Sequence, residues 1–401
     1  MLRPLFLLLL LFTIYSCSKA ESDVSPESST PEETEIEEVS AYLVKVEPAV
    51  SHSAALLESI LSLVTSEEDE FSIQDIIRHK VFYNTLDAEN NPIEASGVLF
   101  LPAENTELQG IVSLQHSTLQ SDAMAPSNST VGINEYTVGA FFASIGYLTV
   151  MSDHIGYGNT KELRHLYEVK NAYTNVPYDL LLAGEDFLNE NEIAIPDSLY
   201  LVGYSNGAFA SLALQQFIED QNYFQITTTF AGAGAYDKNR FAKDLLSQDQ
   251  DLNFMGTYLW VLDVYNSIYP SLNRSWDTYL QEPYAARLTA VGEIQAAVPD
   301  SIIDLNPKNL FQPSFLEGVL NDSDQALISI LDDNSVLDWK PVAPITFYHG
   351  TEDDFVFPLN TENALESLTQ NGAIVNYIPL EGKGHSSAAF PFFLSVLKEL
   401  Q

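Results

Sequence analysis

The sequence has few basic residues and almost no cysteine. Its 401 residues include 17 lysines and arginines against 56 aspartates and glutamates, a formal net charge of −39. Such a protein repels the phosphate backbone, so this imbalance excludes a nucleic-acid-binding role. The single cysteine excludes a disulfide within the chain. We expect an extracellular or salty environment, because dissolved ions screen the mutual repulsion of the carboxylates.

The apolar stretch at the start of the chain, residues 5–14, is too short to cross a membrane, which takes about 20 helical residues. With Arg3 before it, the stretch is typical of a secretory signal peptide, which we place at residues 1–16. The lone cysteine follows at once, in Ile14-Tyr15-Ser16-Cys17. This pattern resembles a bacterial lipobox, so we predict that Cys17 carries lipid. The alternative is an ordinary signal peptide with a cysteine nearby by chance.

Residues 17–40 are rich in serine, glutamate, proline and threonine and contain little that could be buried. They predict a disordered, lipidated tether. Together with the lipobox, this segment predicts a protein of the bacterial cell envelope that is lipid-anchored to a membrane, with the outer membrane and the cell surface among the locations left open.

The rest of the chain is rich enough in apolar residues, 46% overall, to build a large core. Residues 81–102 are typical of two strands joined by a turn, and strand-like and helix-like segments then alternate. The expected strands are 111–114, 147–151, 199–202, 226–230, 345–348 and 374–378, and the expected helices are 135–145, 176–187, 208–218 and 361–369. This alternation predicts an α/β fold with a mostly parallel central sheet and helices on both faces.

The alternation stops between Tyr236 and Pro341, where the pattern is helical and many residues are aromatic. We predict a helical insertion at residues 237–340. It interrupts a core made of residues 41–236 and 341–401.

The sharpest motif is Gly203-Tyr204-Ser205-Asn206-Gly207, which matches G-x-S-x-G. An apolar strand pattern precedes it and an alanine-rich helix pattern follows. Glycines on either side of the serine leave room for the sharp strand-to-helix turn that exposes a nucleophile. We therefore predict that Ser205 is a nucleophile. The alternative is a structural serine in a turn.

A serine hydroxyl needs a base, and the base needs an acid to orient it. In this kind of fold the acid follows the serine along the chain and the histidine comes last. Of the seven histidines, only His385 follows a late strand, in a glycine-flanked loop, and we predict that it is the base rather than a surface histidine. The acid is expected just after strand 345–348, where Asp353 is the first choice and Asp354 the second. His349 precedes both aspartates along the chain and is expected to be a packing or turn residue and not the base.

These motifs resemble those of the serine α/β-hydrolases, and most closely those of the secretory lipase family (the yeast lipase A type) and its bacterial lipoprotein relatives. The similar stretches span about residues 80–390. They are Glu94-Ala95-Ser96-Gly97, Ser113-Leu114-Gln115-His116 with Ala125-Pro126-Ser127, Ser152-Asp153-His154-Ile155-Gly156-Tyr157-Gly158, the Ser205 turn, and Gly350-Thr351-Glu352-Asp353 with Val356. The resemblance implies an α/β-hydrolase fold, hydrolysis of carboxylic esters, and a helical cap inserted before the strand that carries the acid.

The resemblance also implies an oxyanion hole, in which backbone N–H groups bind the negative oxygen of a tetrahedral intermediate. One donor would be the N–H of Asn206, and the other would come from the loop around Thr118 or Leu119. The chain departs from the family pattern at two places. His116-Ser117-Thr118 stands where related sequences usually have His-Gly, which bears on the second donor. The proline after the acid is displaced by one, to Pro358, which bears on the identity of the acid.

We therefore predict a carboxylic ester hydrolase, an esterase or lipase, that forms an acyl-enzyme on Ser205. Two alternatives remain open. A serine peptidase of the prolyl-oligopeptidase type is less favoured because no long repeat-built N-terminal region is present, and a non-catalytic binding lipoprotein would not need all three residues. No metal-ligand spacing or phosphate-binding loop is present, so we expect neither a metal nor another cofactor. We expect a monomer. Its expected partners are an ester substrate and a membrane, which it would bind only through the lipid anchor.

The lipid prediction is tested by Cys17→Ser. Each buried methylene contributes about 0.8 kcal/mol, so two or more acyl chains hold a protein stably where one is marginal. The variant is expected to leave the membrane fraction and remain folded, as measured by cell fractionation and by the mass of the N-terminal peptide. Wild-type protein found free in the medium with an unmodified Cys17 would contradict the prediction.

Overall fold

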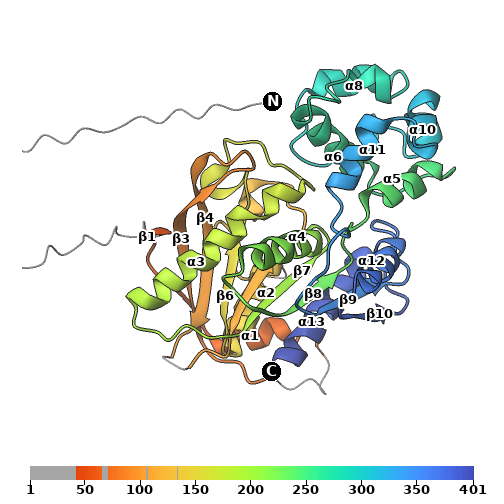
Figure 1. Cartoon of the computed structure of the whole chain (residues 1–401). Helices are drawn as coiled ribbons and strands as arrows, with labels where there is room; N and C mark the ends of the chain where they lie inside the picture. Colours follow the sequence, from red (N-terminus) through yellow and green to blue (C-terminus); the bar gives the residue numbers. More distant parts are fainter. Residues whose placement is uncertain (1–41, 66–70, 105–106, 133) are drawn as a thin grey trace, which may run out of the picture. The chain divides into compact units, whose positions relative to one another are not determined.

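A single mixed sheet runs through the computed structural model, which describes residues 42–65, 71–104, 107–132 and 134–401 (Figure 1). The predicted signal peptide, Cys17 and the predicted tether lie outside these residues. The strands are β1 (Leu43–Val46), β2 (Val50–His52), β3 (Ile76–Leu86), β4 (Pro92–Pro102), β5 (Ile111–Gln115), β6 (Leu148–Ser152), β7 (Leu199–Tyr204), β8 (Ile226–Gly232), β9 (Ile345–Gly350) and β10 (Val375–Leu380).

The strand order is β1-β3-β4-β6-β5-β7-β8-β9-β10, with β2 also paired to β3. In this order, each pair of neighbours in β6-β5-β7-β8-β9-β10 is parallel. At the opposite edge of the sheet, the pairs that involve β1, β2, β3 and β4 are antiparallel. Because the carboxyl ends of parallel strands lie at one edge, the segments that follow β5, β7, β9 and β10 converge there. The predicted mostly parallel sheet is thus confirmed.

Helices cover both faces of the sheet because successive strand side chains point to opposite sides. In β5, Val112 and Leu114 pack in one apolar cluster with residues of α2 (Glu135–Ser144) and α13 (His385–Leu400). Ile111 packs in another cluster with residues of α3 (Asn175–Glu190) and α4 (Asn206–Gln221). The core helices are α1 (Ala54–Leu61), α2 (Glu135–Ser144), α3 (Asn175–Glu190), α4 (Asn206–Gln221), α12 (Leu359–Gln370) and α13 (His385–Leu400). No helix in the described part of the chain is long and apolar enough to span a membrane.

Between β8 and β9 the described chain forms helices, with one isolated β-bridge between Leu280 and Phe311. Figure 1 shows these helices gathered beyond the end of the sheet. They are α5 (Lys238–Ser247), α6 (Met255–Ile268), α7 (Trp276–Tyr279), α8 (Tyr284–Val291), α9 (Pro307–Leu310), α10 (Pro313–Leu320) and α11 (Gln325–Asp333). We call α5 to α11 the helical segment; its limits as a separate domain stay a prediction.

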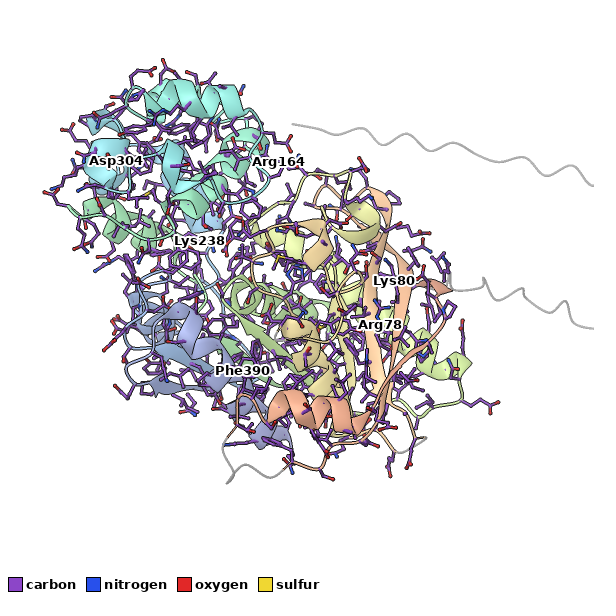
Figure 2. The ribbon with its side chains drawn as sticks, turned by 180° about the vertical axis from the view of Figure 1, so that it is seen from behind. Arg78, Lys80, Arg164, Lys238, Asp304 and Phe390 are labelled. Carbon is purple, nitrogen blue, oxygen red and sulfur yellow. The ribbon has the colours of Figure 1, made fainter. Side chains whose placement is uncertain are left out.

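A buried ion pair joins the helical segment to the core. Figure 2 labels Lys238 near the place where the helical segment meets the core. Lys238, the first residue of α5, pairs with Glu168 of the core, and its ammonium also donates to the carbonyl oxygen of Ala235 at 2.7 Å. Both side chains are at most 8% exposed. Burial lowers the pKa of Lys238, and the Glu168 carboxylate opposes that shift. The ammonium also lies 3.5 Å from the centre of the Phe209 ring, so its charge faces a carboxylate, a carbonyl and a ring face.

This pair predicts an asymmetric response to substitution. Lys238→Met leaves the Glu168 carboxylate buried without a partner, which costs about 3–5 kcal/mol of unfolding free energy. The double variant Lys238→Met, Glu168→Gln removes both charges and is expected to be more stable than Lys238→Met alone. Urea unfolding measures both. A loss below about 1 kcal/mol for Lys238→Met would mean that the pair is solvated in solution.

Candidate active site

Ser205 lies in the turn between β7 and α4, in a backbone conformation that few side chains adopt, φ 56° and ψ −123°. The turn is tight enough to exclude side chains on both sides. A Cβ on Gly203 would lie 2.1 Å from the carbonyl oxygen of Gly207, and a Cβ on Gly207 would lie 2.1 Å from that of Gln115. The glycines of the G-x-S-x-G motif are therefore required by close backbone approach as well as by the turn.

The structure brings Ser205, His385 and Asp353 into one hydrogen-bonded chain. Nε2 of His385 lies 2.9 Å from Oγ of Ser205, and Nδ1 of His385 lies 2.7 Å from Oδ2 of Asp353. All three side chains are buried. They come from the turn after β7, the segment after β9 and the segment after β10, which meet at the carboxyl edge of the sheet. His385 is the first residue of α13 and directly follows the glycine-flanked loop.

The Asp353 carboxylate is held on both oxygens. Oδ1 accepts the backbone N–H groups of Phe355 at 2.9 Å and Val356 at 3.0 Å, and Oδ2 lies 3.3 Å from Nε2 of His349 as well as beside His385. Burial raises the pKa of Asp353, but the bonds from His349 and His385 outweigh it and hold the pKa below its ordinary value. An ionised, fixed carboxylate is thus aimed at Nδ1 of His385.

Asp354 and His349, the other candidates near the acid, have different neighbours. Asp354 is exposed, and its Oδ2 accepts a bond from the Asn253 amide at 2.6 Å. His349 is fully buried, with Nδ1 2.7 Å from the Thr361 hydroxyl and Nε2 2.7 Å from the carbonyl oxygen of Val356. Of the two aspartates, therefore, only Asp353 is bonded to His385 in this structure.

The expected oxyanion donors lie in the segments that follow β7 and β5. Asn206 is the first residue of α4, so its N–H has no carbonyl partner within the helix. Thr118 and Leu119 follow β5, and within the described residues neither backbone N–H has an acceptor. Two tyrosines hold this loop: the Tyr167 hydroxyl lies 2.6 Å from Oγ1 of Thr118, and the Tyr157 hydroxyl donates to the Leu119 carbonyl oxygen at 2.8 Å.

Residues 153–158 support the same loop. The Asp153 carboxylate accepts the Ser96 hydroxyl at 2.5 Å and the Ser127 N–H at 2.7 Å. The backbone carbonyl oxygen of Asp153 lies 3.2 Å from Nε2 of His116. Burial lowers the pKa of His116 and, more strongly, that of His154, which favours the neutral form of both rings.

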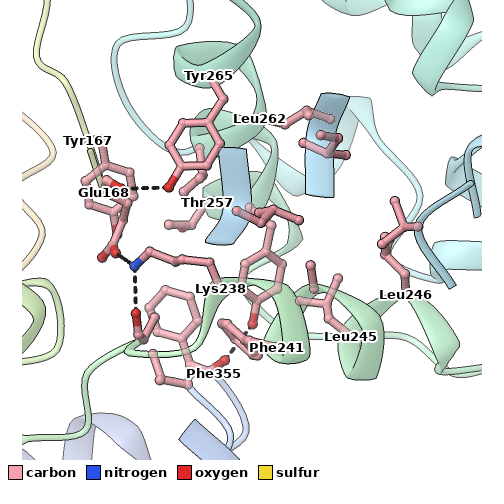
Figure 3. A pocket seen from close by; sticks show the side chains of 18 of the residues that line it. Tyr167, Glu168, Lys238, Phe241, Leu245, Leu246, Thr257, Leu262, Tyr265 and Phe355 are labelled. Carbon is pink, nitrogen blue, oxygen red and sulfur yellow. Dashed lines mark hydrogen bonds and ion pairs between the residues drawn. The ribbon is translucent and has the colours of Figure 1, made fainter. Parts of the chain in front are cut away.

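An apolar pocket adjoins Ser205, and Figure 3 shows much of its lining. The walls combine core residues, such as Tyr167 and Phe355, with many from the helical segment. Those from the helical segment include Phe241, Leu245, Leu246, Val261, Leu262, Tyr265, Phe311, Phe315, Val319, Leu327 and Leu331. Its charged lining residues, Lys238 and Glu168, neutralise each other. In the described residues, no group of three or more His, Cys, Asp or Glu side chains could hold a metal ion.

Comparisons with solved structures identify the fold. A Legionella pneumophila protein assigned as a hydrolase is 23% identical, with a TM-score of 0.77 over 90% of this chain and 98% of that one. The rice cell wall degrading esterase LipA of Xanthomonas oryzae is 20% identical, with a TM-score of 0.75 over 90% and 96%. Candida antarctica lipase A is 17% identical, with a TM-score of 0.61 over 87% and 81%. The fold is that of the α/β-hydrolases.

The sequence comparisons give the family. No curated protein matches the chain. The profile of the secretory lipase family, however, matches residues 119–392, which is more than half of the sequence and includes Ser205, Asp353 and His385. The chain therefore belongs to the secretory lipase family.

Proposed function

We propose that the protein is a carboxylic ester hydrolase that works through an acyl-enzyme on Ser205. The observation that carries the proposal is the hydrogen-bonded chain from Ser205 through His385 to Asp353, at the edge of an apolar pocket. Membership of the secretory lipase family supports ester hydrolysis and indicates a secreted protein. The anchor at Cys17 is a further part of the proposal.

In the first half of the reaction, Oγ of Ser205 attacks the ester carbonyl carbon. Nδ1–H of His385 donates to Asp353, so Nε2 presents its lone pair to the serine and accepts the proton. Asp353 stabilises the imidazolium that forms. His385 then returns the proton to the alcohol oxygen as the bond from that oxygen to the carbonyl carbon breaks, which leaves the acyl group on Ser205.

In the second half, water takes the place of the alcohol. His385 accepts a proton from the water as its oxygen attacks the acyl carbon, and the carboxylic acid leaves when the proton returns to Oγ of Ser205. In both halves the negative carbonyl oxygen binds the N–H of Asn206 and an N–H of the Thr118–Leu119 segment. Each such donor is worth about 10²–10³ in rate.

The helical segment is proposed to act as a cap that binds the acyl chain. Its leucines and phenylalanines make most of the pocket lining, and an apolar chain gains about 0.8 kcal/mol for each methylene that it buries there. An occupied pocket also excludes water, which strengthens the hydrogen bonds of the oxyanion hole. Esters with apolar acyl groups are therefore the proposed substrate class.

The triad proposal predicts that Ser205→Ala and His385→Ala each lose nearly all activity on p-nitrophenyl esters, about 10⁴-fold or more, without unfolding. Asp353→Asn is expected to lose about 10⁴-fold, because the amide favours the wrong tautomer of His385. Its matched control is Asp354→Asn, which is expected to stay within about threefold of the wild type because Asn can still accept from Asn253.

The opposite ranking of the two aspartate variants would overturn the choice of acid. A fluorophosphonate probe distinguishes the alternatives: a non-catalytic binding protein would leave the probe unreacted. A peptidase would react with the probe but also turn over peptide p-nitroanilides.

The cap proposal predicts that Leu246→Phe shortens the longest acyl chain accepted. Figure 3 draws Leu246 across the pocket from Tyr167, so the larger side chain takes up space in the pocket. Activity on p-nitrophenyl decanoate is expected to fall about tenfold relative to activity on the acetate.

Leu272→Phe is the matched control, because Leu272 is equally buried among the same helices but does not line the pocket. It should leave the ratio of decanoate to acetate activity unchanged. Equal ratios in the wild type and both variants would mean that the pocket does not bind the acyl chain.

A further inference from the structure

Glu135 forms two hydrogen bonds with Ser117, the residue before the expected second oxyanion donor. The Ser117 N–H donates to Oε2 at 2.8 Å, and the Ser117 hydroxyl lies 2.6 Å from Oε1. Glu135 is the first residue of α2, where the positive end of the helix dipole favours a carboxylate. Asn134 caps this helix by accepting the N–H of Thr137 at 3.2 Å, so the position of Glu135 is fixed by the helix as a whole.

The same serine also reaches the nucleophile turn. The Ser117 hydroxyl donates to the carbonyl oxygen of Tyr204 at 2.9 Å, and Tyr204 directly precedes Ser205. Ser117 therefore links three parts of the site: α2, the loop after β5 and the turn that carries Ser205. Because Glu135 occupies the Ser117 N–H, that group is not free to bind an oxyanion, which leaves the N–H groups of Thr118 and Leu119.

We propose that Glu135 is a positioning residue for the oxyanion hole, which acts through Ser117 to hold the Thr118–Leu119 segment against the Ser205 turn. This inference rests on the proposed ester hydrolase function. Glu135 does not line the apolar pocket beside Ser205. It fixes the distance between the two oxyanion donors, one on each side of the Ser117–Tyr204 bond.

The hydrogen-bonding pattern at Ser117 specifies what can replace the glutamate. Burial raises the pKa of Glu135 to about 7, against the two Ser117 bonds that lower it. A protonated Glu135 would donate to the hydroxyl oxygen of Ser117 and still accept the backbone N–H of Ser117. The hydroxyl hydrogen of Ser117 is then free to bond to the carbonyl oxygen of Tyr204. A glutamine can make the same two bonds to Ser117, whereas an alanine can make neither and leaves only the bond from Ser117 to Tyr204.

The test compares Glu135→Ala with Asn134→Ala, which loosens the same end of α2 but removes no contact to Ser117. With p-nitrophenyl butyrate, Glu135→Ala is expected to lower kcat about tenfold or more and to change KM by less than about twofold, because donors to the oxyanion act mainly in the transition state. Asn134→Ala is expected to keep the wild-type kcat. Glu135→Gln is expected to recover most of the kcat that Glu135→Ala loses.

An alkyl trifluoromethyl ketone, which forms a tetrahedral oxyanion on a serine, provides a second measurement. Its affinity is expected to fall by the same factor as kcat in Glu135→Ala. It is also expected to fall in Ser117→Ala, which keeps the N–H bond to Glu135 but loses the hydroxyl that bonds to Tyr204. Equal kcat losses in Glu135→Ala and Asn134→Ala, or no loss in either, would overturn the inference. Wild-type protein without esterase activity would instead overturn the proposed function.

Discussion

Ser205 keeps an unfavourable backbone conformation because the turn around it leaves no other path for the chain. Its N–H donates to the carbonyl oxygen of Gly232 at 2.7 Å, which ties the turn to β8, and its own carbonyl oxygen accepts the N–H of Ala208 at 2.9 Å. The approach of Gly203 to Gly207 and of Gly207 to Gln115 closes the remaining space. Strain of this kind persists only where the surroundings enforce it. The position of the serine hydroxyl, the start of α4 and the Asn206 N–H all follow from this one turn.

The helical segment contacts two of the loops that surround Ser205. Asp354 bonds to Asn253, and the carbonyl oxygen of Phe355 accepts the Tyr258 hydroxyl at 2.7 Å, so the segment holds the chain directly after Asp353. Tyr167, which bonds to Thr118, stacks on Trp260 of α6 with ring centres 4.3 Å apart. The helical segment therefore contacts both the chain that follows Asp353 and, through Tyr167, the loop that holds Thr118.

The sequence was sufficient to predict most of the core strands and helices, the membership of the family and the residues that meet at the site, because these follow from local patterns, but it did not predict the short strands β1 and β2. The spacing of G-x-S-x-G and the position of His385 after the last strand are such patterns. The choice between Asp353 and Asp354 is different, because both follow the same strand and only the path of the loop decides which carboxylate faces the histidine. The helix α13 is also hard to predict, since Pro391 interrupts its pattern and proline usually ends a helix. The roles of Glu135, Tyr157 and Tyr167 depend on contacts between residues 18 to 49 positions apart, which no local pattern reports.

The central claim is that Ser205 carries the acyl group during turnover. Mixing the protein with excess p-nitrophenyl butyrate, quenching in acid within milliseconds and mapping the peptides by mass spectrometry measures this directly. The account predicts a butyryl group on the peptide that contains Ser205, formed at the rate of the initial burst of p-nitrophenol and absent in His385→Ala. Steady ester hydrolysis with the acyl group on another residue would contradict it.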